Sequence, residues 1–439
     1  MKDLIKDNWI ELLLILIAFA SLFISAIPAV PFAALCLLLI FIRLDVLGII
    51  LLCIYAVPKL AGAICLVFGI PGVGGALILL APALVIYNCF ITKKYKLSNI
   101  NKSTTGFLLL FTYLFFSVAF LGIDWSWMKL LYTIINGVVA FFVYAAVFSN
   151  YQKCNFIRTG LYFILIAFLL LLLSPIFNNG SGPSGLLDFG YLRIQNIEFG
   201  DDEIEGIIAY QQVGFVAVLG FGTIILEELK GKINMAFLFV TLLLSSFASF
   251  YAGARQFIVV SVMLVVVWSV FEKRGAATKI FVPLIVGVFL FFILKLLLSS
   301  EGMLNSVVTD GYLEASKRGD RIEEGIDGFH SSPLYGIGYG CYKHNGATGG
   351  YPHNLFVEIL CELGILGLLV FWIPLFRPTW SVIKKMRPCI YIFIVYFMRS
   401  MASGGLDTNI YIFSYILATY SCFSYGQNNQ LINKQNEIQ

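Results

Sequence analysis

The feature that most constrains this chain is a succession of long apolar segments separated by short charged connections. A helix needs about 20 apolar residues to cross the roughly 30 Å hydrocarbon core of a bilayer. Hydrophobic residues make up 59% of the sequence and charged residues only 12%, whereas soluble domains average about one half and one quarter. The composition excludes a cytosolic enzyme, a disordered chain and a nucleic-acid binder. It predicts an all-α, polytopic integral membrane protein.

We expect one membrane domain over residues 1–439 with about 12 to 14 transmembrane helices. Residues 29–42 are short for a span, and Lys59 interrupts the third segment directly after Pro58. Twelve full spans with a re-entrant pair are therefore the alternative to fourteen. The candidate spans are residues 9–27, 29–42, 46–67, 73–92, 106–122, 129–148, 159–177, 207–226, 234–252, 256–271, 280–298, 353–376, 388–402 and 409–425.

The distribution of basic residues predicts the orientation in the membrane. Most of the 29 lysines and arginines fall in every second connection, together with the two termini. The positive-inside rule then places both termini in the cytoplasm. Two long connections, residues 178–206 and 299–352, lie outside as periplasmic loops, and we expect the second to be partly helical.

All three histidines lie in the second loop or at its end: His330, His344 and His353. Their spacing matches no common zinc motif, so we expect neither a metal nor another cofactor. Histidine avoids lipid, which explains part of this clustering. Even so, the chain concentrates its proton-transfer chemistry in this loop.

His353 stands where a span begins, at the outer boundary between water and lipid. Asn354, Glu358 and Glu362 follow at intervals of four and therefore share one helix face. Carboxylates inside a membrane helix normally face the bundle interior or a watery cavity. We interpret His353 as a general base above a polar cavity, with Asn354 and Glu358 binding substrate. The alternative is an interfacial histidine, with Glu358 bonded to backbone groups.

Several arginines lie on the predicted outer side, against the positive-inside rule. Guanidinium groups favour bidentate phosphate binding, and a lipid diphosphate in the outer leaflet would account for them. Arg255 stands in a very short turn without an acid nearby in sequence. We expect it to be catalytic, and expect the others to bind substrate. These other candidates are Arg193, Arg318, Arg321 and Arg399.

Arg318 and Arg321 lie three residues apart, on one face of a predicted amphipathic helix. Its expected apolar side is formed by Ile322, Ile326 and Phe329. An alternative role for the two arginines is ion pairing with neighbouring acids. These acids are Asp320, Glu323 and Glu324.

The residues Pro333–Gly340 read Pro-Leu-Tyr-Gly-Ile-Gly-Tyr-Gly, and this run predicts a tight turn close to a substrate, with Tyr339 as a binding residue. Together with His353-Asn354, Glu362 and Gly364, the run resembles the signature of the bacterial O-antigen ligase/polymerase superfamily. The short turn Gly253–Arg255 is similar to that family's motif of small residues and an arginine. Arg193 stands where many members carry an arginine motif, although the glycine of that motif is missing.

The resemblance implies a metal-independent, inverting glycosyltransferase of the GT-C-like membrane type. Its substrates would be undecaprenyl-diphosphate-linked oligosaccharides at the periplasmic face of the bacterial inner membrane. An acceptor hydroxyl would attack the anomeric carbon, with His353 as general base and arginines binding the diphosphate. A chain-length regulator in the same membrane is a candidate partner.

The chain is most similar to a Wzy-type O-antigen polymerase of surface polysaccharide, which joins lipid-linked repeat units. The main alternative is an O-antigen ligase, which transfers the finished glycan to lipid A–core. The acidic outer surface favours the polymerase, because a ligase must approach an anionic acceptor. Polymerisation of a capsule or exopolysaccharide is a related alternative. A flippase or other transporter of polyisoprenoid-linked glycans is a third class, although no internal repeat supports it.

Overall fold

The structure is a computed structural model of the full-length chain. It describes residues 2–24, 28–97, 101–177, 191–192, 208–231, 233–271, 287, 318–348, 350–385, 387–401 and 404–436. Of the predicted segments, the span 280–298 lies outside these residues except for residue 287, as does nearly all of the first long loop. The second long loop is described from residue 318 onwards.

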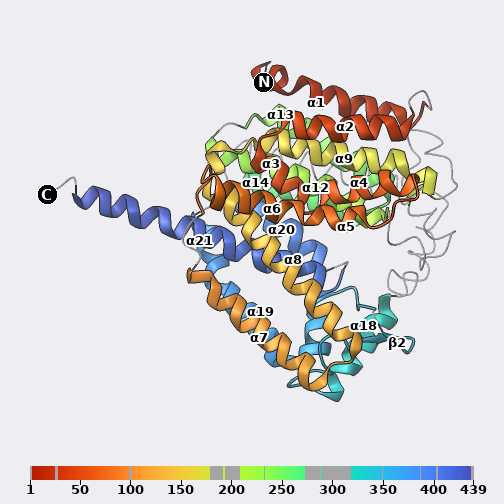
Figure 1. Cartoon of the computed structure of the whole chain (residues 1–439), viewed down its shortest axis with the longest axis vertical. Coiled ribbons are helices and arrows are strands. Elements are labelled where there is room, and N and C mark those ends of the chain that lie inside the picture. Colours follow the sequence, from red (N-terminus) through yellow and green to blue (C-terminus); the bar gives the residue numbers. More distant parts are fainter. Residues whose placement is uncertain are drawn as a thin grey trace.

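The described chain is built from helices and one two-stranded hairpin of four residues (Figure 1). Apart from 280–298, every predicted span overlaps a helix. The elements are α1 (Lys2–Ser21), α2 (Ala29–Arg43), α3 (Val46–Cys53), α4 (Ala56–Val67), α5 (Val73–Ile78), α6 (Leu80–Val85), η1 (Ile86–Ile91), α7 (Asn101–Leu121), α8 (Asp124–Ser149), η2 (Tyr151–Lys153), α9 (Phe156–Phe177), α12 (Tyr210–Ile225), η3 (Leu226–Lys230), α13 (Met235–Ala252), α14 (Arg255–Phe271), α18 (Arg318–Ser331), β1 (Lys343–His344), β2 (Ala347–Thr348), α19 (Leu355–Lys385), α20 (Cys389–Ser400) and α21 (Leu406–Asn436).

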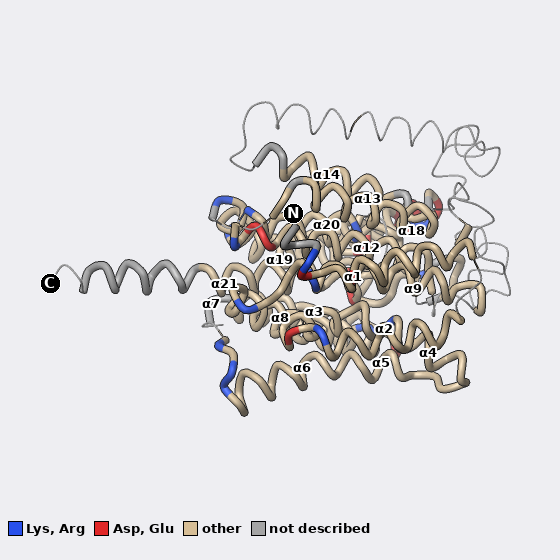
Figure 2. The backbone as a smooth tube through the Cα atoms, turned by 90° about the horizontal axis from the view of Figure 1, so that it is seen from above, with Lys and Arg blue, Asp and Glu red and all other residues tan. Residues whose placement is uncertain are grey.

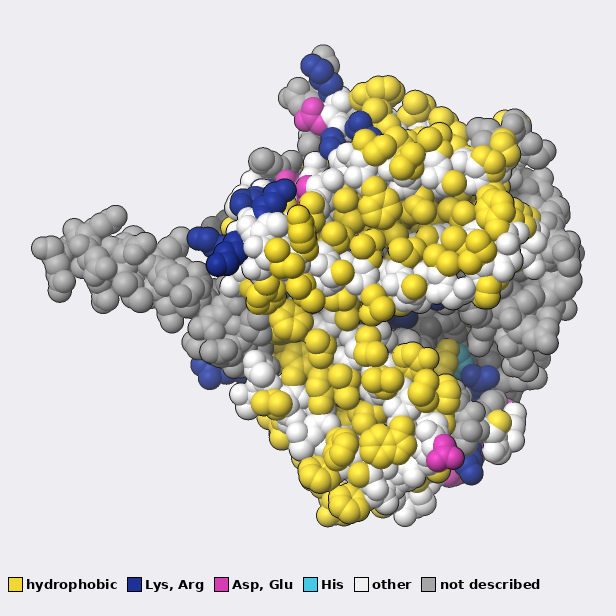
Figure 3. All heavy atoms as spheres, in the orientation of Figure 1, with side chains coloured by type: hydrophobic (Ala, Val, Ile, Leu, Met, Phe, Trp, Pro, Cys, Tyr) yellow, Lys and Arg dark blue, Asp and Glu magenta, His cyan; other side chains and the backbone are white. Residues whose placement is uncertain are grey.

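Six helices within the described residues are long and apolar enough to cross a membrane: Val73–Ile91, Thr104–Leu121, Asp124–Ser149, Phe156–Phe177, Tyr210–Lys230 and Leu355–Lys384. A bent pair, α3 with α4, makes a seventh if it is counted as one span. Four shorter apolar helices lie in α2, α13, α14 and α20. Large apolar side chains are exposed along the bundle, for example Phe120 (79%) and Phe376 (79%). Figure 3 shows such side chains covering much of one face, as a lipid-facing surface requires. The all-α, polytopic membrane architecture is thus confirmed.

The bundle has a buried interior made by the most apolar helices. α9 and α12 are the most enclosed, and 83% of the apolar window in each is buried. These two helices pack against each other, while α8 packs against α21. The hairpin and α18 lie at one end of α8 and α19, away from the projecting C-terminal part of α21 (Figure 1). The core of the fold is therefore apolar, and the polar loop structure is held at one end.

The opposite end gathers basic residues that the sequence places in cytoplasmic connections. The buried Glu11 forms ion pairs with Arg43 at 2.8 Å and Arg158 at 3.3 Å. Lys230 pairs with Glu227 at 3.0 Å. In Figure 2 most lysines and arginines drawn lie towards the end from which α21 projects. This arrangement agrees with the charge pattern on which the predicted orientation rests.

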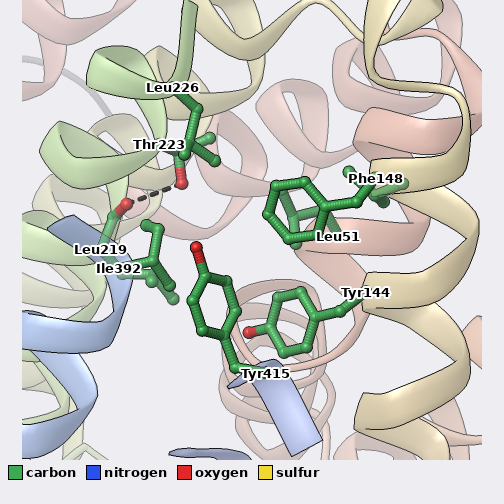
Figure 4. A pocket seen from close by; sticks show the side chains of 9 residues that line it. Leu51, Tyr144, Phe148, Leu219, Thr223, Leu226, Ile392 and Tyr415 are labelled. Carbon is green, nitrogen blue, oxygen red and sulfur yellow. Dashed lines mark hydrogen bonds between the residues drawn. The ribbon is translucent and has the colours of Figure 1, made fainter. Parts of the chain in front are cut away.

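An apolar pocket lies within the bundle, between α3, α8, α12, α20 and α21 (Figure 4). Thr223 is the one lining residue whose hydroxyl is tied to its own helix, donating to the carbonyl of Leu219 at 2.7 Å. Tyr415 donates instead to the carbonyl of Cys389 at 2.7 Å. The lining contains no charged residue, so this pocket is not the polar site that the sequence predicts. The lining residues are Leu51, Tyr144, Val147, Phe148, Leu219, Thr223, Leu226, Ile392 and Tyr415.

Candidate active site

The central contact of the candidate site joins two residues that the sequence analysis selected separately. Arg321 on α18 and His353 before α19 meet side chain to side chain, with Nη1 2.9 Å from Nε2. Guanidinium can only donate, so Nε2 of His353 must accept and carries a lone pair. The acids beside Arg321 in sequence form no ion pair with it within the described part of the chain. The alternative of neighbouring salt bridges is therefore wrong for Arg321.

The backbone holds His353 in an unusual conformation. Its φ is +56°, in the left-handed region that residues other than glycine seldom adopt. The imidazole lies edge-on to Tyr351, with ring centroids 4.5 Å apart. Backbone strain in a residue other than glycine is typical of functional sites. A glycine would fit this backbone more easily, so the position is occupied by histidine for its side chain.

Asn354 fixes where α19 begins, immediately after His353. Its side-chain oxygen accepts from the backbone N–H of Phe356 at 2.9 Å and of Val357 at 3.3 Å. This is an N-cap, which satisfies N–H groups that the first helical turn leaves without partners. The predicted role of Asn354 in substrate binding stays a prediction, and the oxygen already has this structural role.

Two carboxylates of α19 face the bundle interior and share one cation. Lys129 on α8 lies 2.7 Å from Oε1 of Glu358 and 2.7 Å from Oε2 of Glu362. The side chains of all three are nearly enclosed, with 8%, 1% and 1% exposed. Glu358 also accepts from the backbone N–H of Leu406 at 3.0 Å, so the structure contains the backbone bond of the alternative interpretation. We call Lys129, Glu358 and Glu362 the carboxylate–lysine triad.

The triad connects the start of α19 to the glycine-rich run. Glu362 Oε1 accepts from the backbone N–H of Tyr342 at 3.3 Å. The ammonium of Lys129 lies 4.8 Å from the centre of the Tyr339 ring. Tyr339 is fully buried, and its hydroxyl bonds to Thr133. Tyr339 is thus enclosed among protein side chains, and its predicted role in substrate binding stays a prediction.

The glycine-rich run packs along a break in α19 and does not form an open turn. Gly364 has φ +65° and ψ −167°, a conformation reserved for glycine, and it interrupts the helix. The freed carbonyls of Cys361 and Glu362 accept from the N–H groups of Ile337 and Gly338, at 2.9 and 3.0 Å. The run does turn tightly, as expected, since the N–H of Gly336 donates to Ser332 at 2.8 Å and that of Cys341 to Gly338 at 3.1 Å. Its closeness to a substrate stays a prediction.

Only glycine allows this close approach between the two segments. A Cβ on Gly336 would lie 2.3 Å from the backbone of Glu362, and one on Gly364 would lie 2.5 Å from that of Leu334. The N–H groups of Ile365 and Leu366 complete the pairing by donating to Pro333 and Leu334. The spacing of the run and of Gly364 therefore has a structural cause.

α18 packs on α19 through glycines. A Cβ on Gly325 would lie 2.6 Å from Val357, and one on Gly328 would lie 2.5 Å from Cys361. Ile326, expected on the apolar packing side, is 43% exposed. The helix itself is as predicted, and Ile322 and Phe329 of the expected apolar side are partly buried, so the prediction of the packing face is wrong for Ile326 alone.

Tyr342 ties α18 to the hairpin. Its hydroxyl donates to the carbonyl of Arg321 at 2.9 Å and to Glu324 at 3.1 Å. Burial raises the pKa of Tyr342 well above its usual value, and the nearby Glu324 adds to the rise. The hydroxyl therefore keeps its proton and keeps Arg321 in place beside His353.

The remaining predicted site residues are described only in part. Arg255 is the first residue of α14 and follows the left-handed Gly253, but its side chain lies outside the described atoms, as does that of Arg318. Arg193 lies outside the described residues altogether. Arg399 is described and buried on α20, without a contact to His353. Among the described residues no three acids, histidines or cysteines come close enough to hold a metal ion.

Residues 233–372, which include α18, the hairpin and the start of α19, match the family described as O-antigen ligase. This match supports the resemblance of the chain to the O-antigen ligase/polymerase superfamily. This family is one of glycosyl-transfer enzymes in lipopolysaccharide biosynthesis, so the protein is a multi-pass membrane enzyme of glycosyl transfer. No curated protein matches the chain in a sequence search. The matched segment contains His353, Arg321, Glu358 and Glu362, whereas Lys129, Arg193 and Arg399 lie outside it.

Lys129 is the residue whose place in the site the sequence did not reveal. It was one of the basic residues on the predicted outer side, and 229 residues separate it from Glu358. The available signal was that two carboxylates inside a span require a cation. Lys129 stands in an apolar segment at the same predicted depth, and it was the natural candidate.

Proposed function

We propose that the protein is a polymerase of O-antigen or a similar surface polysaccharide. It joins undecaprenyl-diphosphate-linked oligosaccharide repeats at the periplasmic face of the inner membrane. The contact between Arg321 and His353 is the observation that carries the proposal. It brings together a base for the acceptor hydroxyl and a cation for the diphosphate, in the segment that matches the family.

The reaction needs one proton acceptor and positive charge on the leaving group. The acceptor sugar's hydroxyl oxygen bonds to the anomeric carbon of the donor, and its proton passes to Nε2 of His353. The bond from that carbon to the diphosphate breaks, and undecaprenyl diphosphate leaves with the electron pair. Attack opposite the leaving group inverts the anomeric configuration. A positioned base contributes typically 10²–10⁴-fold to such a step.

The resting contact suits this sequence of events. Arg321 keeps a lone pair on Nε2 by donating to it, since a protonated nitrogen would repel guanidinium. When substrates bind, the acceptor hydroxyl replaces Arg321 at Nε2, and the guanidinium turns to the diphosphate. Arg255, Arg318 and Arg193 add positive charge to that group, which arginine supplies without a metal. The triad holds α19 and the glycine-rich run so that His353 stays in place.

Ligation to lipid A–core is the second candidate, and the family's description favours it. The two differ in the acceptor and not in the chemistry of the donor. In a polymerase the acceptor is another lipid-linked repeat, whereas in a ligase it is the core oligosaccharide. The acidic outer side predicted from the sequence favours the lipid-linked repeat.

A purified-component assay tests the proposal. The protein, in detergent or nanodiscs, is given undecaprenyl-diphosphate-linked repeats, and products are separated by size. A ladder of longer lipid-linked chains is expected, and it should vanish in His353→Ala. No ladder from repeats alone, with transfer to added lipid A–core, would show a ligase. A ladder that persists in His353→Ala would contradict the mechanism.

A further inference from the structure

A second concentration of positive charge lies in the bundle, apart from His353. Arg399, near the end of α20, is only 7% exposed, and its Nη1 is buried without a hydrogen-bond partner. No ion pair joins it to an acid among the described residues. A buried cation without a counter-charge is strongly unfavourable. Some ligand or function must therefore compensate for it.

The surroundings of Arg399 are aromatic. Its guanidinium carbon lies 4.3 Å from the centre of the Phe215 ring and 5.0 Å from that of Tyr55. Cation–π contacts offset part of the loss of hydration. They bring no negative charge, however, so they leave the group able to bind an anion. They also hold the guanidinium in one orientation.

Tyr55 stands at the break between α3 and α4, which bend by 67°. Its φ of −146° and ψ of −52° are not helical, and no side chain caps the N-terminus of α4. The N-terminus of a helix carries partial positive charge and attracts anions. Broken membrane helices commonly turn such ends towards bound substrate groups. Arg399 stacks on the residue at this break.

Lys59 adds a second full positive charge, in the first turn of α4. A cation there is unfavourable with respect to the helix dipole. The side chain of Lys59 is partly buried. Its positive charge and that of Arg399 repel each other. No acid forms an ion pair with Lys59 in the described part of the chain. The sequence marked Lys59 as a misfit within its span, and a bound anion would explain it.

We propose that Arg399, Lys59 and the N-terminus of α4 form a second anion site, which binds the diphosphate of a polyprenyl-linked substrate. The three positive features converge at a helix break, and no negative group among the described residues balances them. In the sequence, α20 is followed by α21, whose first N–H bonds to Glu358 of the triad. The choice of a lipid diphosphate rests on the proposed function, since a polymerase must hold two such substrates. The anion preference does not depend on it.

Binding of radiolabelled geranylgeranyl diphosphate to the purified full-length protein tests this site. Loss of one charged hydrogen-bonding partner costs about 1.5–3 kcal/mol, or roughly 10–150-fold in affinity. We expect Lys59→Met and Arg399→Gln each to weaken binding by at least about tenfold. Arg321→Gln should keep this component of binding, because it changes the other site. Unchanged binding in both Lys59→Met and Arg399→Gln would overturn the proposal.

The unfolding temperature of the ligand-free protein provides a second readout. If Lys59 had a structural role, its replacement would lower this temperature, whereas the anion site predicts no loss. Lys59→Met removes repulsion between cations, so its unfolding temperature should equal or exceed that of the wild type. Lys230→Met is the matched control, because Lys230 has an acid partner in Glu227. It should lower the unfolding temperature and leave diphosphate binding unchanged. A clear loss of stability in Lys59→Met would show a structural pairing and overturn the anion site.

Two further ligands distinguish the source of the phosphate. Geranylgeraniol, which lacks phosphate, should not compete, and inorganic pyrophosphate should compete only weakly. Equal competition by pyrophosphate would support the anion site but overturn its assignment to a lipid.

If wild type makes a glycan ladder while Lys59→Met and Arg399→Gln bind normally, the second site is wrong and the proposed function stands. If their binding is impaired and no ladder forms in any protein, the anion site stands and the proposed function is wrong.

Discussion

Replacement of Lys129 by methionine is the perturbation whose effect the structure defines best. Lys129 bridges Glu358 and Glu362 at 2.7 Å each, with at most 8% of any of these side chains exposed. Methionine has a similar length but no charge, so the variant leaves two carboxylates facing each other in the interior. Removing one partner of a buried ion pair costs about 3–5 kcal/mol. We expect a loss of at least this size, since two pairs are lost together.

The loss can be expressed as a change in unfolding temperature. An unfolding entropy of about 2.1 cal/mol/K per residue over 439 residues gives roughly 0.9 kcal/mol/K. A cost of about 4 kcal/mol then lowers the unfolding temperature by about 4 °C. Thermal unfolding of the purified protein in detergent, followed by size-exclusion chromatography of heated samples, measures the shift. Glycan transfer should fall as well, because the triad fixes the start of α19 close to His353.

A charge-neutral triple variant separates charge from size. Lys129→Met combined with Glu358→Gln and Glu362→Gln removes the unpaired charges. Glutamine keeps the oxygen that accepts from Leu406 or Tyr342. We expect the triple variant to recover most of the stability that Lys129→Met loses. Equal unfolding temperatures for wild type and Lys129→Met, or no recovery in the triple variant, would refute the reasoning.

Three other changes test the candidate site. His353→Gly should fold at least as well as wild type, because φ is +56° at this residue. Its transfer rate should fall by about 10²–10⁴-fold. A large loss of stability would show that the backbone of His353 is not strained. Gly364→Ala should cost about 3 kcal/mol or more, because it combines left-handed strain with overpacking where a Cβ would lie 2.5 Å from Leu334. Gly75→Ala, with nothing within 4 Å, is its control in the same thermal assay and should be neutral or slightly stabilising. Arg255→Ala should lower the transfer rate by about 10²–10³-fold with unchanged amounts in the membrane, and full activity would remove Arg255 from the mechanism.

The helices could be predicted because apolar length alone requires them in a membrane. The sequence did not predict the position of the break between α3 and α4. It showed only that Pro58 and Lys59 are unusual within an apolar segment. The 67° bend lies at Tyr55, whose ring contacts Arg399, a residue far away in the sequence. Periodicity within one segment carries no information about such contacts. A break that depends on tertiary contacts is therefore found only in the structure.

In the candidate site, too, the sequence predicted features within one helix but not contacts between helices. The face shared by Glu358 and Glu362 follows from helical spacing, and both carboxylates do face the interior. Their partner Lys129 comes from another helix, and so does the contact of Arg321 with His353. The roles assigned to the arginines and to His353 stay predictions until the substitutions are measured.

The close packing of α18 on α19 explains why the predicted base His353 and the predicted substrate-binding Arg321 meet. Gly325 and Gly328 let α18 approach until a Cβ at either position would overlap Val357 or Cys361. Arg321 stands one turn before Gly325, so this approach brings its guanidinium to His353 at the start of α19. A larger residue at Gly325 would push the helices apart by the width of a methyl group or more. That displacement is enough to break a 2.9 Å contact, and it would impair the site without changing any residue that touches substrate.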